Sequence, residues 1–179
     1  MDTSLIVEGG TLGLAAEYAV AAELCRRNIY AQLTLGHQKR TDLLVFSADG
    51  EMARVEVKAK QTPEWPACKG IFGKRVFLVL VDLAARALDS RPDFYVLSAE
   101  DWRAVVENRI AEIRSRSPEK QIVVDQENVV VFVDEKGKSG KPRRGTNIGV
   151  HLVRSYREQW SKILTALRVP SQPTGVQPH

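Results

Sequence analysis

The spacing of apolar residues divides the first half of the chain into one helix and a series of strands. Apolar positions recur at helical spacing over residues 12–27, where Thr11 can cap the helix and Asn28 can stop it. Runs of β-branched and aromatic residues predict strands at residues 29–35, 40–46, 53–60, 75–83 and 93–98. The run at 75–83 is apolar almost throughout, which predicts a strand buried on both faces.

The second half is predicted to hold two more helices and a hairpin. Ser98 opens an amphipathic helix whose apolar positions are Trp102, Val105, Val106, Ile110 and Ile113. Residues 121–134 predict a hairpin. A last helix carries Trp160, Ile163, Leu164 and Leu167 and ends before Pro170.

Two segments between these elements are expected to be irregular. Residues 62–75 contain two prolines and two glycines and predict a loop, and residues 135–146 predict a mobile basic loop. With no internal repeat, the chain is expected to form one domain over residues 1–169, followed by a disordered tail at 170–179.

Composition and charge narrow the function classes. Hydrophobic residues make up 44% and charged residues 27%, as in ordinary globular proteins. The longest apolar run is broken by Asp82 and falls short of the ~20 residues that span a bilayer, so no membrane partner is expected. Two isolated cysteines favour a cytoplasmic setting. The net charge of +4, with basic clusters at 69–75 and 136–144, permits a polyanionic partner.

Three charged residues stand out in the hairpin at residues 41–60. Glu56 and Lys58 share one face of their strand because side chains alternate. A two-residue turn would put Asp42 on the opposite face, whereas a three-residue loop at 48–50 puts it opposite Glu56. Gly50 suits the left-handed position of the three-residue loop, so we expect that register.

Two carboxylates at the edge of a core would repel each other unless a cation neutralises them. Mg²⁺ is commonly held by one or two carboxylates, so Asp42, Glu56 and Lys58 fit a metal-assisted phosphodiester hydrolase. The alternative is a structural salt bridge. Glu17 lies in the apolar stripe of the first helix, where a metal site or a salt bridge to Lys58 would accommodate it. Glu23 is expected to be an ordinary solvated charge.

The segments GLAAEYAVAAELCRRNIYA and RTDLLVFSADGEMARVEVKAKQ together resemble the PD-(D/E)XK nuclease superfamily, in its Holliday-junction-resolvase-like and restriction-endonuclease-like branch. The resemblance implies an α/β fold with an αβββαβ core, in which helices flank a mixed central sheet. It also implies Mg²⁺-dependent cleavage of nucleic acid, with Mn²⁺ as a plausible substitute, and a homodimer. Two departures are that Thr41 replaces a proline and that residues 62–75 show no helix.

Within that resemblance, the catalytic residues are Glu17, Asp42, Glu56, Lys58 and Gln61, and the metal ligands are Asp42, Glu56 and the backbone carbonyl of Val57. Phosphate contacts are expected from Lys60, Lys69, Lys74, Arg75, Arg143 and Arg144. The leading hypothesis is a DNA endonuclease. A nuclease-like module that binds DNA without turnover and an unrelated α/β protein with a buried ion-pair cluster are the alternatives.

Overall fold

The computed structural model describes residues 6–34, 41–84, 89–137 and 139–168. Within these ranges the chain forms an α/β fold whose main sheet has five strands in the order β1-β2-β3-β5-β6. These strands are β1 (Tyr30–Leu33), β2 (Leu43–Phe46), β3 (Met52–Lys60), β5 (Val76–Asp82) and β6 (Asp93–Ser98). The sheet is mixed, because β3 and β5 are parallel and the other neighbours are antiparallel.

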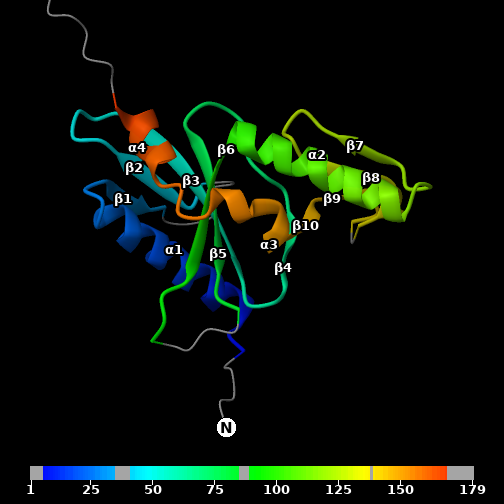
Figure 1. The fold of residues 1–179 in the computed structure, drawn as a ribbon, viewed down its shortest axis with the longest axis horizontal. Coiled ribbons are helices and arrows are strands. Elements are labelled where there is room, and N and C mark those ends of the chain that lie inside the picture. The colour runs from blue at the N-terminus through cyan, green and yellow to red at the C-terminus, as the bar shows by residue number, and fades with distance from the viewer. Residues whose placement is uncertain (1–5, 35–40, 85–88, 138, 169–179) are drawn as a thin grey trace, which may run out of the picture.

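The remaining elements cover the two faces of this sheet (Figure 1). One face packs against α1 (Gly9–Cys25) and α4 (Ser161–Leu167). The other face packs against two smaller sheets and the helices near them. One small sheet pairs β4 (Glu64–Cys68) with β10 (Thr146–Gly149), and the other contains β7 (Ile122–Val124), β8 (Val130–Lys136) and β9 (Pro142–Arg144). The helices are α2 (Ala99–Arg116) and α3 (Val150–Val153), and α3 is followed by the 3₁₀ turn η1 (Arg154–Tyr156). The predicted mixed sheet flanked by helices is therefore confirmed.

The first helix begins earlier than the sequence predicted. Its cap is Glu8, whose carboxylate accepts a hydrogen bond from the Thr11 N–H at 3.2 Å, so Thr11 lies inside the helix. The expected stop is confirmed, because the helix ends at Cys25 and Asn28 adopts a left-handed φ of 60°. Leu14, one of the apolar residues that the helical spacing predicts to be buried, is 48% exposed.

The predictions for α2 and β5 are confirmed. Ser98 and Asp101 form a reciprocal capping box at the start of α2. The buried residues of that helix are the five expected ones, Trp102, Val105, Val106, Ile110 and Ile113. The six residues 76–81 of β5 are all buried, as a strand covered on both faces requires.

Two segments expected to be irregular contain strands. Residues 62–75 include β4, and β3 and β5 are joined through that strand rather than through a helix, so the expected αβββαβ order is not what the structure has. Residues 135–146 include β9, which extends the predicted hairpin of β7 and β8 into a three-stranded sheet. The expected tail at 170–179 lies outside the described residues.

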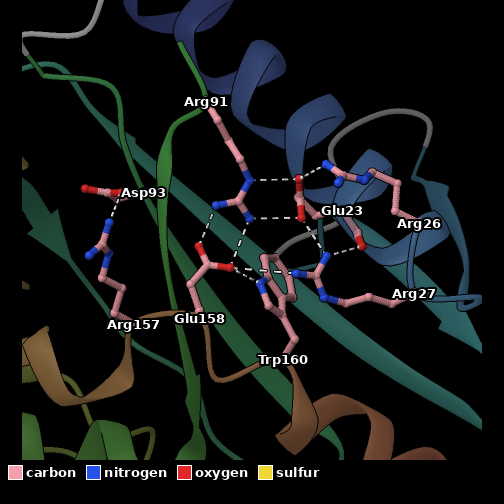
Figure 2. A network of polar contacts seen from close by, with 8 residues as sticks. All are labelled: Glu23, Arg26, Arg27, Arg91, Asp93, Arg157, Glu158 and Trp160. Atoms are coloured by element: carbon pink, nitrogen blue, oxygen red, sulfur yellow. Dashed lines mark hydrogen bonds and ion pairs between the residues drawn. The ribbon is translucent and has the colours of Figure 1, made fainter.

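Glu23 is buried rather than solvated, which corrects the sequence-based expectation. Its side chain is 7% exposed and receives hydrogen bonds from Arg91 at 2.9 and 3.0 Å and from Arg27 (Figure 2). Arg91 also pairs with Glu158, whose carboxylate accepts a hydrogen bond from the Trp160 indole at 2.8 Å. This network ties α1 to the segment before β6 and to the start of α4.

We predict that Glu23→Gln destabilises the fold at pH 7 by about 2 kcal/mol, the usual cost of losing a hydrogen bond to a charged group. Arg91 is 43% exposed, so solvent screens the pairing and the loss stays below the about 3–5 kcal/mol of a fully buried pair. Hydrogen bonds from Arg91 and Arg27, opposed by burial, lower the pKa of Glu23 from 4.5 to about 2.

The stabilising effect of Glu23 is therefore complete above its unfolded-state pKa and is lost as the pH falls from 4.5 towards 2. Urea unfolding of wild type and Glu23→Gln should show a difference that is largest at pH 7 and shrinks below pH 4.5. Glu107→Gln, at an exposed position of α2, serves as the control. A difference independent of pH would contradict the assigned role of the carboxylate.

Candidate active site

The hairpin of β2 and β3 has the register that the sequence predicted. Leu43 pairs with Val55 and Phe46 pairs with Met52, so paired positions sum to 98. The loop is closed by a hydrogen bond from the Ser47 N–H to the carbonyl of Glu51 at 2.9 Å, which leaves three residues at its tip. Gly50 supplies the left-handed residue, with a φ of 82°.

The two strands part directly after Val55. β3 continues alongside β5 as far as the pair Lys60↔Asp82, but no described residue pairs with its other edge beyond Val55. Asp42, the residue before β2, fills the first gap on that edge. Its Oδ2 accepts a hydrogen bond from the Val57 N–H at 2.6 Å, and its own N–H donates to the carbonyl of Val55 at 3.0 Å. The Asp42 carboxylate therefore takes the place of a strand neighbour.

Glu56 and Lys58 lie on the face of β3 that is turned away from α1. They are level with Leu78 and Leu80 of β5, which belong to the core beneath α2, whereas Val55 packs in the core beneath α1. Cys68 of β4 is their neighbour on this face. Burial raises the pKa of the Cys68 thiol to about 12, while Lys58 lowers it and Glu56 raises it. Cys68 was not recognised in the sequence, because β4 was taken for an irregular loop.

Glu17 approaches from the opposite face of the sheet. It lies on α1 next to the buried residues Ala16, Val20 and Ala21, and is itself half-buried. Burial and the nearby charge of Asp42 both raise the pKa of Glu17. Glu17 and Asp42 are thus electrostatic neighbours near the point where β2 leaves β3.

Asp42 lies near charged residues on both faces of the main sheet. Burial raises the pKa of Asp42, and this effect is opposed by the hydrogen bond from Val57 and by the positive charge of Lys58. Asp42 is therefore an electrostatic neighbour both of Glu17 on α1 and of Lys58 on β3. The structure therefore brings Glu17, Asp42 and Lys58 near one another, from α1, from the residue before β2 and from β3.

The group of Glu17, Asp42 and Lys58 differs from the other charged clusters in whether its charges have ion-pair partners. Glu23 has arginine partners, and Lys60 pairs with Asp82 at 2.7 Å. Within the described part of the chain, no basic residue forms an ion pair with Glu17 or Asp42, and Lys58 pairs with neither of them. The salt bridge from Glu17 to Lys58, considered as an alternative, is thus not formed between these described residues.

Carboxylate oxygens are the ligands that Mg²⁺ prefers, and one or two of them are a usual number for that ion. Asp42 and Glu56 supply two, and Oε2 of Glu56 is buried from solvent. Within the described residues, no three or more His, Cys, Asp or Glu side chains are grouped so that they could hold a metal ion. The metal ligands expected from the sequence, Asp42, Glu56 and the carbonyl of Val57, therefore stay a prediction.

Gln61 is engaged with the segment before α1. Its side-chain amide accepts a hydrogen bond from the Val7 N–H at 3.0 Å and donates to the Val7 carbonyl at 2.6 Å. These two bonds fix the segment before α1 against the end of β3, ten residues before Glu17. Val7 was not recognised in the sequence, since a backbone partner leaves no pattern of side chains.

The residues expected to contact phosphate fall into three groups. For Lys60 the expectation is wrong, because the residue is 3% exposed, its ammonium pairs with Asp82 at 2.7 Å, and it lies 4.7 Å from the centre of the Trp65 ring. Lys69, Lys74 and Arg75 are exposed in the segment between β4 and β5.

Arg143 and Arg144 form the third group, on β9. Arg143 pairs with Glu135, and Arg144 pairs with Asp125 and Glu127. Both arginines are thus held in place by acids of the same three-stranded region, at positions that solvent can reach.

Among solved structures, the chain is similar to one described as that of a bacterial homing endonuclease, I-Ssp6803I. The TM-score is 0.43, with 19% sequence identity, over 88% of this chain and 93% of the other. No protein-family model and no curated protein matches the sequence. No helix in the described ranges is long and apolar enough to cross a membrane.

We predict that Asp42→Asn, studied without divalent cations, makes the fold more stable at pH 7. Asparagine keeps an oxygen that can accept the Val57 N–H and removes the charge that burial disfavours. Because the pKa of Asp42 is raised in the folded state, its ionisation costs stability as the pH rises above its ordinary value of 3.8.

The gain in the unfolding free energy should therefore shrink as the pH falls towards 3.8, and the pKa of Glu17 should fall in the variant. Urea unfolding and NMR titration of the Glu17 carboxyl measure the two effects. A loss of stability at pH 7 would show that Asp42 serves as a structural charge partner instead.

Proposed function

We propose that this chain is a metal-dependent endonuclease that hydrolyses phosphodiester bonds of DNA, with a site of the PD-(D/E)XK type. The observation that carries the proposal is the half-buried pair of like charges, Glu17 and Asp42, beside Lys58. Burial raises the pKa of both acids, and among the described residues no basic side chain forms an ion pair with either of them. A structural cluster would offset such charges with partners, as the chain does at Glu23 and Lys60.

The residues that would hold the ion are Asp42 and Glu56, with the backbone carbonyl of Val57 as a further ligand. When bound, Mg²⁺ supplies positive charge to the phosphate and acidity to its bound water, and Mn²⁺ would substitute. The hydrogen bond from Val57 to Asp42 supports this assignment because it fixes the carboxylate against β3.

The protein's own side chains would orient the reactants. Lys58 would donate hydrogen bonds to the attacking water, and its position on a strand paired along its length with β5 restricts its movement. Glu17 would assist by accepting a proton or a hydrogen bond from that water. The clamp between Gln61 and Val7 would position Glu17, because it fixes the segment that leads into α1.

The substrate would be bound by positive charge around the site. The exposed residues Lys69, Lys74 and Arg75 lie between β4 and β5, and Arg143 and Arg144 lie on β9, which gives two basic segments for phosphate contacts. Since one site cuts one strand, we further propose that two copies of the chain act together on duplex DNA.

We predict that Glu56→Ala abolishes cleavage and that Lys58→Ala lowers its rate at least about 100-fold, the lower end of what a positioned proton-transfer group contributes. The assay incubates purified protein with supercoiled plasmid and with branched DNA, in Mg²⁺, Mn²⁺ or EDTA. Glu107→Ala, an exposed acid of α2, is the matched control and should cut like the wild type.

Cleavage that survives both substitutions would come from a contaminant and would contradict the proposal. Binding of DNA without cleavage under any of these conditions would instead assign the chain to the alternative class, a nuclease-like module that binds DNA without turnover.

A further inference from the structure

A cavity of about 280 Å³ lies between α2 and the strands β8, β9 and β10, and none of the acids of the candidate active site lines it. Three of the residues that line it are basic: Arg109 of α2, Lys120 after α2, and Arg143 of β9. The aromatic ring of Phe132 and the side chain of Thr146 line it as well, and both residues are buried. Figure 1 shows these elements grouped beside α2.

The basic residues are held in place by neighbours on several elements. Arg109 donates from Nε to the Thr146 hydroxyl at 3.5 Å and from Nη1 to Glu112 at 3.0 Å. Lys120 pairs with Glu135 at 2.9 Å. Arg143 pairs with the same Glu135 through Nε, donates from Nη1 to the Gly145 carbonyl at 3.2 Å, and has its guanidinium 3.6 Å from the centre of the Phe132 ring.

These contacts do not use all of the N–H donors of the three basic residues. A guanidinium has five N–H groups and an ammonium has three. Among the described contacts of Arg109 and Arg143, neither uses Nη2, and Lys120 makes one hydrogen bond. Three cations line the cavity against two carboxylates, those of Glu112 and Glu135, and Glu112 also binds His151 at 2.7 Å. The cavity is therefore positively charged and has unused donors that are fixed in place.

We propose that this cavity binds a phosphodiester group of the nucleic-acid backbone and so anchors the substrate beyond the cleavage site. Arginine donors match the oxygens of a phosphate, and a lysine adds a point charge. The volume lies just below the about 300–1,000 Å³ of pockets that enclose a whole small molecule, which suits one group of a longer chain. The identity of the ligand rests on the proposed function.

The cavity and the acids flank the same pair of strands. Thr146 of β10 pairs with Cys68 of β4, and Cys68 is the electrostatic neighbour of Glu56 and Lys58. The side chain of Asn147, which also lines the cavity, accepts a hydrogen bond from the Ala67 N–H at 3.1 Å. A strand of DNA that reaches the acids along β4 would thus pass close to the cavity.

The test compares two double variants of the 179-residue chain. Lys120→Gln with Arg143→Gln removes two charges from the cavity. Arg157→Gln with Lys162→Gln removes one arginine and one lysine that also form ion pairs, with Asp93 and Asp101, outside the cavity. The affinity for a labelled 20-base-pair duplex is measured by fluorescence anisotropy between 50 and 200 mM salt, in EDTA so that no cleavage occurs.

Loss of one phosphate contact should lower the slope of log K against log salt by about 0.9, which corresponds to about 3.5-fold over this salt range. We expect that change in the cavity variant and not in the control. Equal slopes in the two variants would overturn the inference. Because the measurement needs no metal, a protein that fails to cut DNA but shows the slope change contradicts the proposed function alone.

A second titration tests whether the cavity binds the DNA backbone or a free phosphate ion. Inorganic phosphate is added at constant ionic strength while the melting temperature is followed. Phosphate could stabilise the wild type but not the cavity variant, while the salt slopes for DNA are equal in the two double variants. This result would mean that the cavity binds a free phosphate ion, which contradicts the inference. We expect the cavity variant to differ from the control in its binding of DNA.

Discussion

The candidate site depends on the point at which β2 leaves β3. Up to Val55 the two strands form an ordinary antiparallel ladder, and beyond it β3 keeps only its parallel neighbour β5 among the described strands. The freed edge needs a hydrogen-bond acceptor, and the Asp42 carboxylate provides one for the Val57 N–H at 2.6 Å. A single hydrogen bond thus satisfies the Val57 N–H on this edge and holds an acid in a half-buried position. Glu17 on one face and Lys58 on the other are neighbours of the same carboxylate.

The buried and half-buried charges of this chain are of two kinds, those with a partner of opposite charge and those without an ion pair among the described residues. Lys60 and Glu23 are as buried as core residues, and each is matched by a partner of opposite charge at hydrogen-bond distance. Such pairs hold elements together, since removal of one partner leaves an uncompensated charge. Glu17 and Asp42 are held near each other with raised pKa values, an arrangement that costs stability and that a bound cation would relieve.

Local patterns allowed much of this to be predicted. Gly50 fixed the loop type, and the loop fixed the register that brings Asp42 level with Glu56. The helical spacing and the capping box of α2 identified all of its buried residues. What could not be predicted depends on partners distant in sequence. Glu23 looked solvated because its partner Arg91 lies 68 positions away, and β4 was missed because it pairs with β10, which is distant in the sequence. The unexpected burial of Lys60 has the same kind of cause, its pairing with Asp82.

The central claim is that the edge of β3 next to Asp42 is a divalent-cation site. The most direct measurement is paramagnetic broadening of amide NMR signals by substoichiometric Mn²⁺, in wild type and in Asp42→Asn. We expect broadening centred on the amides of Asp42 and Val57, extending to Glu17 on α1, and absent in the variant. Broadening that is the same in both proteins, or that is centred on another acidic segment such as Glu100 and Asp101 at the start of α2, would contradict it.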